Sequence, residues 1–254
     1  MAAGAKLNKI VTHCDKILKT REFLDWKGAV NGLQVENDGT VTRIAAAVDG
    51  SLRTIEMAIE ACADLLIVHH GLFWGPSHPW TGKKYRMLKL LLDNNLAVYS
   101  SHLPLDAHPK LGNNDGLCSA LGFKVLTPFF FQKERYLGLQ AARKIKRDKL
   151  MEKLEKVLGG KPTLLPGGPE TCQKIGVVTG GAGSELYIAK QEGVDTFITG
   201  EGPHHTFGMA EDLEINVIYG GHYATETFGV KALAQHLSEE FKVTWTFLDH
   251  PSGL

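Results

Sequence analysis

The chain has 254 residues, of which 43% are hydrophobic and 22% are charged. This length and composition are typical of a globular protein with one large domain or two joined lobes, and they argue against a disordered chain. Lys and Arg together number 28, as do Asp and Glu, so the net charge is near zero. Such a chain lacks the long-range field that attracts nucleic acid or an anionic membrane, and we expect neither as a partner.

The four cysteines, Cys14, Cys62, Cys118 and Cys172, are far apart and form no Cys-x-x-Cys motif. The sequence therefore indicates neither a zinc ribbon nor a disulfide framework, and reduced thiols in a cytosol fit best. The segment 7–18 has helical spacing rather than the unbroken apolar core of a signal peptide. No run of about 18 apolar residues is available for a membrane span, and we expect a soluble, cytoplasmic protein.

Short apolar segments alternate with helical patterns along the chain, which predicts an α/β fold. Several of these segments end in Gly, His or Asp, as strands do when they deliver a loop at the edge of a sheet. The expected elements are, in chain order, strand 44–48, helix 52–61, strand 65–68, helix 85–92, strand 96–99, strand 175–178, helix 185–191, strand 196–199, strand 217–219, helix 230–240 and strand 243–248.

Part of the chain repeats. The segment from Ile44 to His70 aligns without a gap with the segment from Ile175 to Glu201, at an offset of 131 residues (175 − 44). In each copy a strand, a turn with glycine, a helix and an Asp lead into a second strand that ends in polar residues. His70 then falls opposite Glu201, which predicts two related β-α-β units.

The next strand repeats as well. The segment 97–106 aligns with the segment 217–226, at an offset of 120 residues (217 − 97). Both copies contain a strand, two small residues, a His, three further residues and a carboxylate. We therefore predict an α/β fold of two pseudo-repeated lobes with mixed sheets, 1–126 and 127–254. The segment 127–172 of the second lobe has no counterpart in the first.

Polar side chains that can bind a metal follow the expected strands. His69 and His70 end the strand 65–68, and the carboxyl ends of strands are where open α/β sheets place their sites. Adjacent strand residues point to opposite faces, so both reach one site only if the strand ends and the chain turns at Gly71. The alternative is a pair of histidines that only form hydrogen bonds.

Two further pairs each join a histidine to an acid four residues later. His102 and Asp106 lie in a loop or an initiating turn, since Pro104 between them discourages a helix interior. His222 and Glu226 lead into a helical pattern, where this spacing puts both on one face. For either pair alone, a local hydrogen bond explains the spacing as well as metal binding does.

Together, these six side chains favour a metal centre. Imidazole and carboxylate groups are ligands of zinc, iron, manganese and nickel. Six ligands exceed one tetrahedral site, whereas two metals about 3.5–4 Å apart, bridged by a carboxylate, would use them all. The absence of cysteine ligands argues against a purely structural zinc. We therefore predict a dinuclear centre between the two lobes.

Other polar residues have weaker claims. His204 and His205 follow another strand end and could line the same cavity, although Pro203 more readily starts a helix there. Asn31 and Gln34 lie in a segment typical of a turn, from which they could orient groups near the site. His78, in a loop between prolines, is a further candidate, whereas we expect His13, His236 and His250 to be surface or packing residues.

Five motifs spread along the chain carry a family resemblance. They are the segments 31–35 (Asn-Gly-Leu-Gln-Val), 69–74 (His-His-Gly-Leu-Phe-Trp), 102–114 (His-Leu-Pro-Leu-Asp-Ala-His-Pro-Lys-Leu-Gly-Asn-Asn), 199–201 (Thr-Gly-Glu) and 221–226 (Gly-His-Tyr-Ala-Thr-Glu). These motifs closely resemble the Nif-three-like dinuclear-metal family over nearly the whole chain. The sequence looks like the compact bacterial form, which lacks a large inserted domain. Members are often labelled as type-two GTP cyclohydrolase-like proteins.

The resemblance implies a set of metal ligands and an assembly. It implies two metal ions per chain and a toroidal hexamer whose sites face an interior cavity. His204 and His205 occupy a variable stretch of the family, so the resemblance gives them no role. The implied ligands are His69, His70, Asp106, His222 and Glu226, with Glu226 as the bridge and His102 at a sixth position.

The leading functional hypothesis is a metal-dependent hydrolase. Two metals lower the pKa of a bridging water, present hydroxide and polarise a carbonyl, ring carbon or phosphoryl oxygen. Glu201 is the candidate general base. A cyclohydrolase and a phosphoesterase would use the same apparatus, so the sequence leaves the substrate open. The alternative is a non-catalytic ring that binds metal and a partner; a ring that threads nucleic acid is disfavoured by the neutral charge.

Overall fold

Two α/β units make up the part of the chain that the computed structural model describes, residues 4–75 and 79–254. The first unit combines Met1–Leu105 with Gly229–His250, and the second combines Asp106–Phe228 with Pro251–Leu254. Each unit is built on its own sheet. Among the described residues, no helix has the length and apolar character that crossing a membrane requires.

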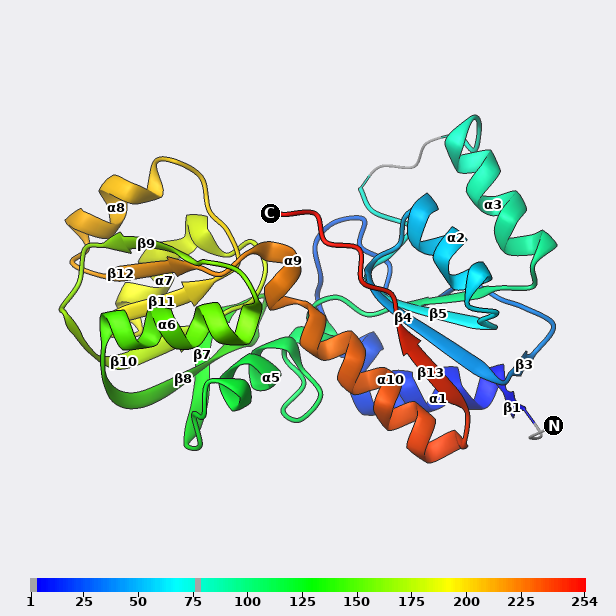
Figure 1. Cartoon of the computed structure of the whole chain (residues 1–254), viewed down its shortest axis with the longest axis horizontal. Helices are drawn as coiled ribbons and strands as arrows, with labels where there is room; N and C mark the ends of the chain where they lie inside the picture. Colours follow the sequence, from blue (N-terminus) through cyan, green and yellow to red (C-terminus); the bar gives the residue numbers. More distant parts are fainter. Residues whose placement is uncertain (1–3, 76–78) are drawn as a thin grey trace. The chain divides into compact units, whose positions relative to one another are not determined.

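A five-stranded sheet forms the centre of the first unit (Figure 1). Its strands are β2 (Gly32–Val35), β4 (Arg43–Asp49), β5 (Leu65–His70), β6 (Ala97–Ser100) and β13 (Thr244–Phe247). They lie in the order β13-β4-β5-β6-β2, parallel except for the antiparallel edge strand β2. A separate antiparallel pair joins β1 (Ala5–Lys6) to β3 (Thr40–Val41).

Helices cover both faces of this sheet, because side chains alternate between its faces and both sets are apolar. On one face α2 (Leu52–Glu60) and α3 (Lys83–Asp93) pack against Ala45, Leu66 and Val98. On the other face, Tyr99 donates a hydrogen bond to Asp15 of α1 (Leu7–Leu18). The helix α10 (Thr227–Phe241) contacts β13, and a 3-10 turn, η1 (Thr20–Glu22), follows α1.

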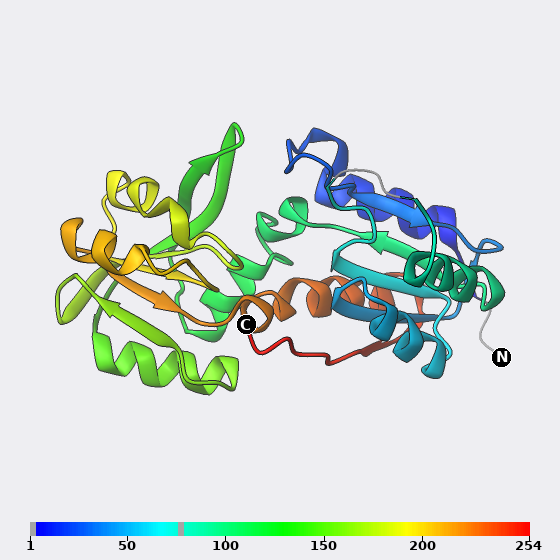
Figure 2. The same ribbon diagram turned by 90° about the horizontal axis from the view of Figure 1, so that it is seen from above.

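The second unit contains a six-stranded mixed sheet. Its strands are β7 (Leu126–Gln132), β8 (Arg135–Lys146), β9 (Thr163–Pro166), β10 (Thr171–Val177), β11 (Thr196–Thr199) and β12 (Asn216–Tyr219), in the order β7-β8-β10-β11-β12-β9. The strands β10, β11 and β12 are parallel, and the others pair antiparallel with their neighbours. Figure 2 shows the β7-β8 hairpin, in green, extending from this sheet.

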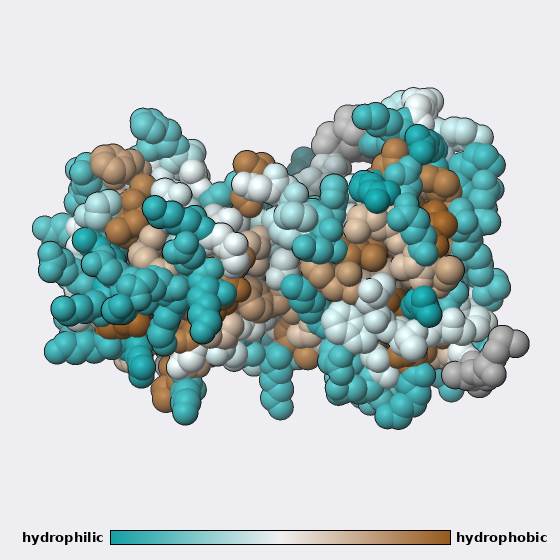
Figure 3. Space-filling model, viewed as in Figure 1, coloured by the Kyte–Doolittle hydropathy of each residue, from teal (hydrophilic) through white to brown (hydrophobic). Residues whose placement is uncertain are grey.

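Two apolar clusters lie on opposite faces of the second sheet. One joins α5 (Asn113–Ala120) and α6 (Arg147–Leu158) to alternate residues of the strands, such as Ile175 and Ile198. The other joins α7 (Leu186–Gln191), which follows η2 (Gly183–Glu185), and α8 (Thr206–Asp212) to Phe197 and Val217. The outer side of α6 is rich in Lys and Glu, and Figure 3 shows a hydrophilic surface over this helix. The charged side of α6 therefore faces solvent, while Leu150 and Leu154 are buried against the sheet.

The division into units differs from the lobes 1–126 and 127–254 expected from the sequence. The C-terminal strand β13 pairs in parallel with β4, with Trp245 opposite Ile44, so the end of the chain completes the first sheet. Residues before 127 belong to the second unit, because Leu117 of α5 is buried in a cluster with the second sheet. The pairing of a strand with a distant edge strand depends on long-range contacts, so the order of the elements along the chain does not predict it.

The strand registers agree with the first part of the expected repeat. In the first unit Ile44 pairs with Leu65, and in the second Ile175 pairs with Thr196, each pair separated by 21 residues (65 − 44 and 196 − 175). The third strand departs by one position. Leu65 pairs with Ala97 and Thr196 pairs with Asn216, so the offset there is 119 (216 − 97) rather than 120.

One hydrogen-bonding device occurs at the start of each repeat. An aspartate just before the second strand accepts hydrogen bonds from two successive backbone N–H groups in or next to the N-terminal half of the first strand. Both aspartates hold neighbouring parallel strands in register. In the first unit Asp64 accepts from Thr42 and Arg43, and in the second Asp195 accepts from Gln173 and Lys174.

We predict that Asp64→Ala and Asp195→Ala each lower the free energy of unfolding by about 0.5–1.5 kcal/mol, because each removes the acceptor of two N–H groups that water can only partly replace. Urea denaturation followed by circular dichroism measures the change. Asp212→Ala, at an exposed position of α8, is the control and should change stability by about 0.5 kcal/mol or less. If only one of the two substitutions lowers the free energy of unfolding, the matching hydrogen bonds of the two units do not contribute equally to stability.

Candidate metal centre

Three histidines come together at one edge of the first sheet. His69 and His70 end β5, and His102 follows the neighbouring parallel strand β6. The ring centroids lie 4.8 Å apart for His69 and His70, 5.0 Å for His69 and His102, and 5.7 Å for His70 and His102. One nitrogen from each ring lies within 4.8 Å of the others, so the set can hold a metal ion.

The Nδ1 atom of each ring donates to a fixed oxygen acceptor. His69 donates to the Ser101 carbonyl at 2.9 Å, and His70 donates to the Asp49 carboxylate at 2.8 Å. His102 donates to the Asp25 carboxylate, also at 2.8 Å. A neutral imidazole with its proton on Nδ1 carries its lone pair on Nε2. This arrangement is typical of histidines that bind a metal through Nε2.

His69 and His70 are the last two residues of β5, which continues two residues beyond the strand 65–68 expected from the sequence. His69 is fully buried, whereas the side chain of His70 is 24% exposed. In the ladder His70 stands opposite Asp49, the last residue of β4, which also accepts its Nδ1–H. The two rings lie near each other although both residues belong to the strand, with their centroids 4.8 Å apart.

Asp25 is a residue of the site that the sequence reasoning missed. Its Oδ1 accepts from the backbone N–H of Trp26 at 2.6 Å as well as from His102, and its Oδ2 accepts from the Asn31 side chain at 2.8 Å. Burial raises the pKa of Asp25, but the hydrogen bonds and charge of His102, with further donors, outweigh it and lower the pKa. The only signal in the sequence is an acid shortly before the segment 31–35.

Asn31 and Gln34 both orient backbone near the three histidines. The Asn31 side-chain oxygen accepts from the backbone N–H of His102 at 2.7 Å. The Gln34 side-chain oxygen accepts from the N–H of Leu72 at 2.7 Å, just after the His69-His70 pair. The segment 31–35 therefore holds the chain that follows β5 and β6, as the sequence suggested for these two residues.

The second unit contributes a histidine and two buried carboxylates. His222 begins the short helix α9 (His222–Thr225), and Glu226 follows that helix. The Nε2 atom of His222 lies 3.2 Å from Glu226 Oε2, and carboxylate oxygens of Asp106 and Glu226 lie within 4.8 Å of each other. Asp106 is 7% exposed and Glu226 is 2% exposed. Carboxylates buried this deeply need a positive partner or hydrogen bonds.

Asparagine side chains hold Asp106 in place. Asn113 donates to Asp106 Oδ1 at 2.8 Å, and the Thr179 hydroxyl donates to the same oxygen at 3.3 Å. Asn114 donates to the Asp106 and Leu137 carbonyls and accepts from the N–H of Thr179. The Asn113-Asn114 pair of the 102–114 motif therefore fixes Asp106, the last residue of the turn α4 (Leu103–Asp106).

Gly180 provides the space for the Glu226 carboxylate. Its φ is +72°, in the left-handed region that favours glycine. A Cβ at this position would collide with Glu226 Oε1. The hydroxyl of Thr225 accepts from the N–H of Gly180 at 3.1 Å, so the turn and the end of α9 are tied together.

His222 lies between two acids. Its Nδ1 donates to Glu201 Oε1 at 2.8 Å, while Nε2 faces Glu226. In the metal-free protein burial lowers the pKa of His222, but Glu226 and Glu201 together outweigh burial and raise the pKa to about 9. A protonated imidazole has no lone pair, so a metal ion that bound through His222 would displace a proton. Glu201 is 47% exposed, and its contact with Nδ1 orients the His222 ring.

Among the described residues, the groups that could hold a metal ion do not include His13, His108, His204, His205, His236 or His250. His204 and His205 are exposed in the segment before α8. His13 and His236 contact each other, with their Nε2 atoms 2.8 Å apart. His250 is exposed, and His78 lies outside the described residues.

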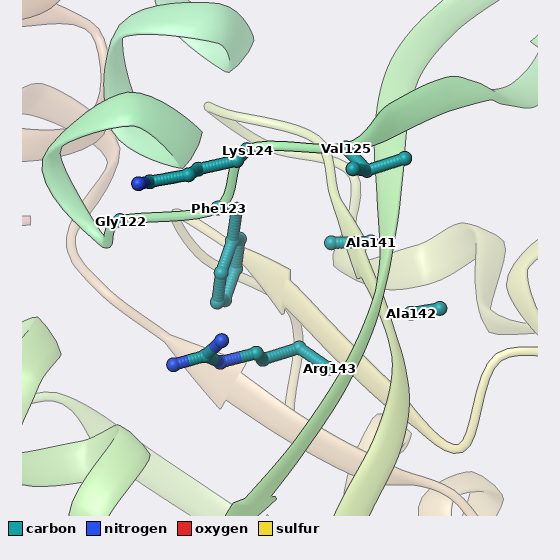
Figure 4. A pocket seen from close by; sticks show the side chains of 7 residues that line it. All are labelled: Gly122, Phe123, Lys124, Val125, Ala141, Ala142 and Arg143. Carbon is teal, nitrogen blue, oxygen red and sulfur yellow. The ribbon is translucent and has the colours of Figure 1, made fainter.

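A cavity in the second unit offers a different chemistry. It has a volume of about 350 Å³ and lies between the turn after α5 and the strand β8. Figure 4 shows the Phe123 ring with the Arg143 guanidinium below it and Lys124 above it. Its lining contains no imidazole, thiol or carboxylate, so it is not a transition-metal site.

The donor set fits a transition-metal centre. Imidazole nitrogens with fixed tautomers and buried carboxylates are ligands of zinc, iron, manganese and nickel, and fixed acceptors behind the ligands are usual in such sites. The side chains that the structure presents in this way are His69, His70 and His102 in the first unit and Asp106, His222 and Glu226 in the second.

Comparison with known proteins identifies the family. The chain is 40% identical over 258 residues to the "GTP cyclohydrolase 1 type 2 homolog" of Pyrococcus horikoshii, covering 97% of this chain and 99% of that protein. It is 38% identical over 228 residues to the protein of the same name from Deinococcus radiodurans, covering 89% and 87%.

A solved structure shares both the sequence similarity and the fold. The crystal structure of TTHA1606 from Thermus thermophilus is 38% identical, with a TM-score of 0.90 that covers 98% of this chain and 100% of that one. The family model Duf34/NIF3 (NGG1p interacting factor 3) matches residues 5–252. The chain therefore belongs to the Duf34/NIF3 family, as its motifs suggested.

Proposed function

We propose that the protein binds two divalent metal ions per chain and uses them as a metal-dependent hydrolase. The observation that carries the proposal is the set of three histidines whose Nδ1 protons are all held by fixed acceptors, so that each Nε2 carries the lone pair. The second unit adds two buried carboxylates and His222. Six donors of these types exceed what one tetrahedral ion uses.

The chain itself links the two ligand sets. His102 immediately precedes the turn α4, and Asp106 is the last residue of that turn. A single helical turn therefore separates a ligand of the first unit from a ligand of the second. This short connection supports our proposal that both sets serve one dinuclear centre.

The residues around the ligands have separate roles in the proposed reaction. Bound divalent ions lower the pKa of water and polarise an electrophilic group of the substrate. Asp25, Asp49 and Glu201 each hold a proton on a histidine Nδ1, which keeps the rings oriented. Glu201 is also half-exposed, so we keep it as the proposed general base, with access to water in addition to His222.

We propose a substrate with a planar heteroaromatic ring. The related proteins carry the name of a GTP cyclohydrolase homolog, and the surface beside the three histidines suits a purine. The Trp74 ring is 48% exposed and contacts His102 edge to face, with centroids 4.8 Å apart, and His70 at 5.8 Å. An exposed indole next to the ligands offers a stacking surface for a base.

The first prediction from this proposal concerns metal content. Protein purified without chelator should carry close to two transition-metal ions per chain, because six donors exceed one tetrahedral site. Inductively coupled plasma mass spectrometry measures the ratio of metal to protein. A ratio of one after dialysis against excess Zn²⁺, Mn²⁺, Fe²⁺ or Ni²⁺ would contradict a dinuclear centre.

A second prediction separates a bridging ligand from a terminal one. A carboxylate has two oxygens and can contact both ions, whereas the coordinating nitrogen of an imidazole contacts one. Glu226→Gln should therefore lower the metal content toward zero, while His222→Ala should lower it by about one ion. Metal analysis with circular dichroism tests this, since both variants should keep their fold. If Glu226→Gln retains two ions where His222→Ala loses one, Asp106 is the better candidate for the bridge.

A third prediction concerns the substrate. Stacking of a base on an aromatic side chain contributes about 1–3 kcal/mol, so Trp74→Leu should weaken GTP binding by about 5- to 150-fold. Equilibrium dialysis measures the dissociation constant, and the metal content should not change. Tyr187→Leu, at an exposed aromatic residue of α7, is the matched control. Equal GTP binding by wild type, Trp74→Leu and Tyr187→Leu would exclude Trp74 as the stacking surface.

A further inference from the structure

We infer that Asp25 is the positioning residue that makes His102 a metal ligand. The inference rests on the proposed function, in which the His69, His70 and His102 set binds metal. Asp25 does not contact the metal-binding nitrogen. It acts through the opposite nitrogen of the ring, Nδ1, which lies 2.8 Å from Asp25 Oδ1.

The Asp25 carboxylate is held rigidly from all sides. Its side chain is 5% exposed. Oδ1 accepts from the N–H of Trp26 and from His102, and Oδ2 accepts from the Asn31 amide at 2.8 Å and from the N–H of Leu103 at 3.3 Å. Four donors therefore fix both oxygens, and the plane of the carboxylate cannot turn without breaking one of these bonds.

The same group of residues fixes the backbone at His102. Leu103 donates to Asp25, and His102 donates its N–H to the Asn31 side chain at 2.7 Å. Both acceptors come from a segment more than 70 residues earlier in the chain, with separations of 77 for Asp25 and 71 for Asn31. The backbone and the ring of His102 are therefore positioned together, which sets the direction of Nε2.

Burial distinguishes Asp25 from the other two carboxylates that accept a hydrogen bond from a histidine Nδ1, Asp49 and Glu201. The Asp49 side chain is 42% exposed and that of Glu201 is 47% exposed, so water can replace either as an acceptor. Asp25 is buried, and the His102 side chain is only 11% exposed. Without Asp25, the Nδ1–H of His102 has no solvent to donate to, and the ring loses the bond that fixes its tautomer and rotation.

The consequence is a difference in metal affinity. Loss of an acceptor behind a metal-bound histidine usually weakens metal binding by about 10- to 100-fold. We expect Asp25→Asn to weaken the binding of one of the two ions, the one bound by His102, by this factor. The neutral amide is a poorer acceptor than the carboxylate, and its NH₂ group can face the Nδ1–H of His102 in place of an acceptor. Asp49→Asn, at the exposed counterpart, should change affinity less than about threefold, because water can take its place.

The test is a double-mutant cycle read by metal binding rather than by activity. Wild type, Asp25→Asn, His102→Ala and the double variant are titrated with Zn²⁺ against a competing chelator. Asp25→Asn should weaken one ion in the presence of His102 and should have no further effect in the His102→Ala background. Circular dichroism and thermal unfolding report whether each variant is folded.

A spectroscopic measurement keeps the inference testable if Asp25→Asn does not fold. In metal-loaded wild-type protein labelled with ¹⁵N-histidine, His102 should carry its proton on Nδ1, with its signals assigned by their loss in His102→Ala. A proton on Nε2 would overturn the inference. Wild-type affinity in Asp25→Asn, or equal weakening in both backgrounds, would overturn it as well.

The design separates failure of the inference from failure of the proposed function. If wild type binds two ions and His102→Ala loses one, the ligand set stands whatever Asp25→Asn does. If wild type binds no Zn²⁺, or if His102→Ala binds it as well as wild type does, His102 is not a ligand. That result overturns the proposed role of His102 and the inference together.

Discussion

The hydrogen bond between a histidine Nδ1 and a fixed oxygen acceptor is the interaction on which the site depends. A neutral imidazole presents one lone pair, and the acceptor decides which nitrogen carries it. In the first unit each of the three histidines donates its Nδ1–H to such an acceptor, which leaves the lone pair on Nε2. The acceptors are the Ser101 carbonyl, Asp49 and Asp25. Parallel strands supply the geometry, because β5 and β6 deliver their last residues to one edge of the sheet. Rings held at this edge can bind metal without first reorganising.

The two units use one strand scaffold for different chemistry. Asp64 and Asp195 make matching hydrogen bonds at the start of the repeats, and the first two strands keep the same register in both. At the far ends of those strands the first unit places His70 and the second places Glu201, which bonds to His222. The strand ends thus position an imidazole in the first unit and, in the second, a carboxylate that accepts a hydrogen bond from an imidazole.

Much of the fold was predictable because strand and helix patterns are local. The expected strands at 44–48, 65–68, 96–99, 196–199 and 217–219 all match observed strands, with most of their ends within one residue. The predicted division at 126 and 127 differs from the observed one, and the third strand of the repeat is shifted by one position. Both differences concern pairing between distant segments, which follows from the edges that strands leave open rather than from periodicity. The hexamer and the role of Glu201 as a base stay predictions.

The sequence by itself determined which residues are candidates for the metal, because histidines and acids stand at strand ends with repeated spacing. Its motifs also indicated the family, which the family model confirms. Only the tertiary structure decided what stands behind each candidate. Asp25 reaches His102 across 77 residues of sequence, and Asn113 and Thr179 converge on Asp106 from different elements. Such acceptors and donors are chosen by distance in space, and an acid in a loop has no local pattern that distinguishes it from a solvated one.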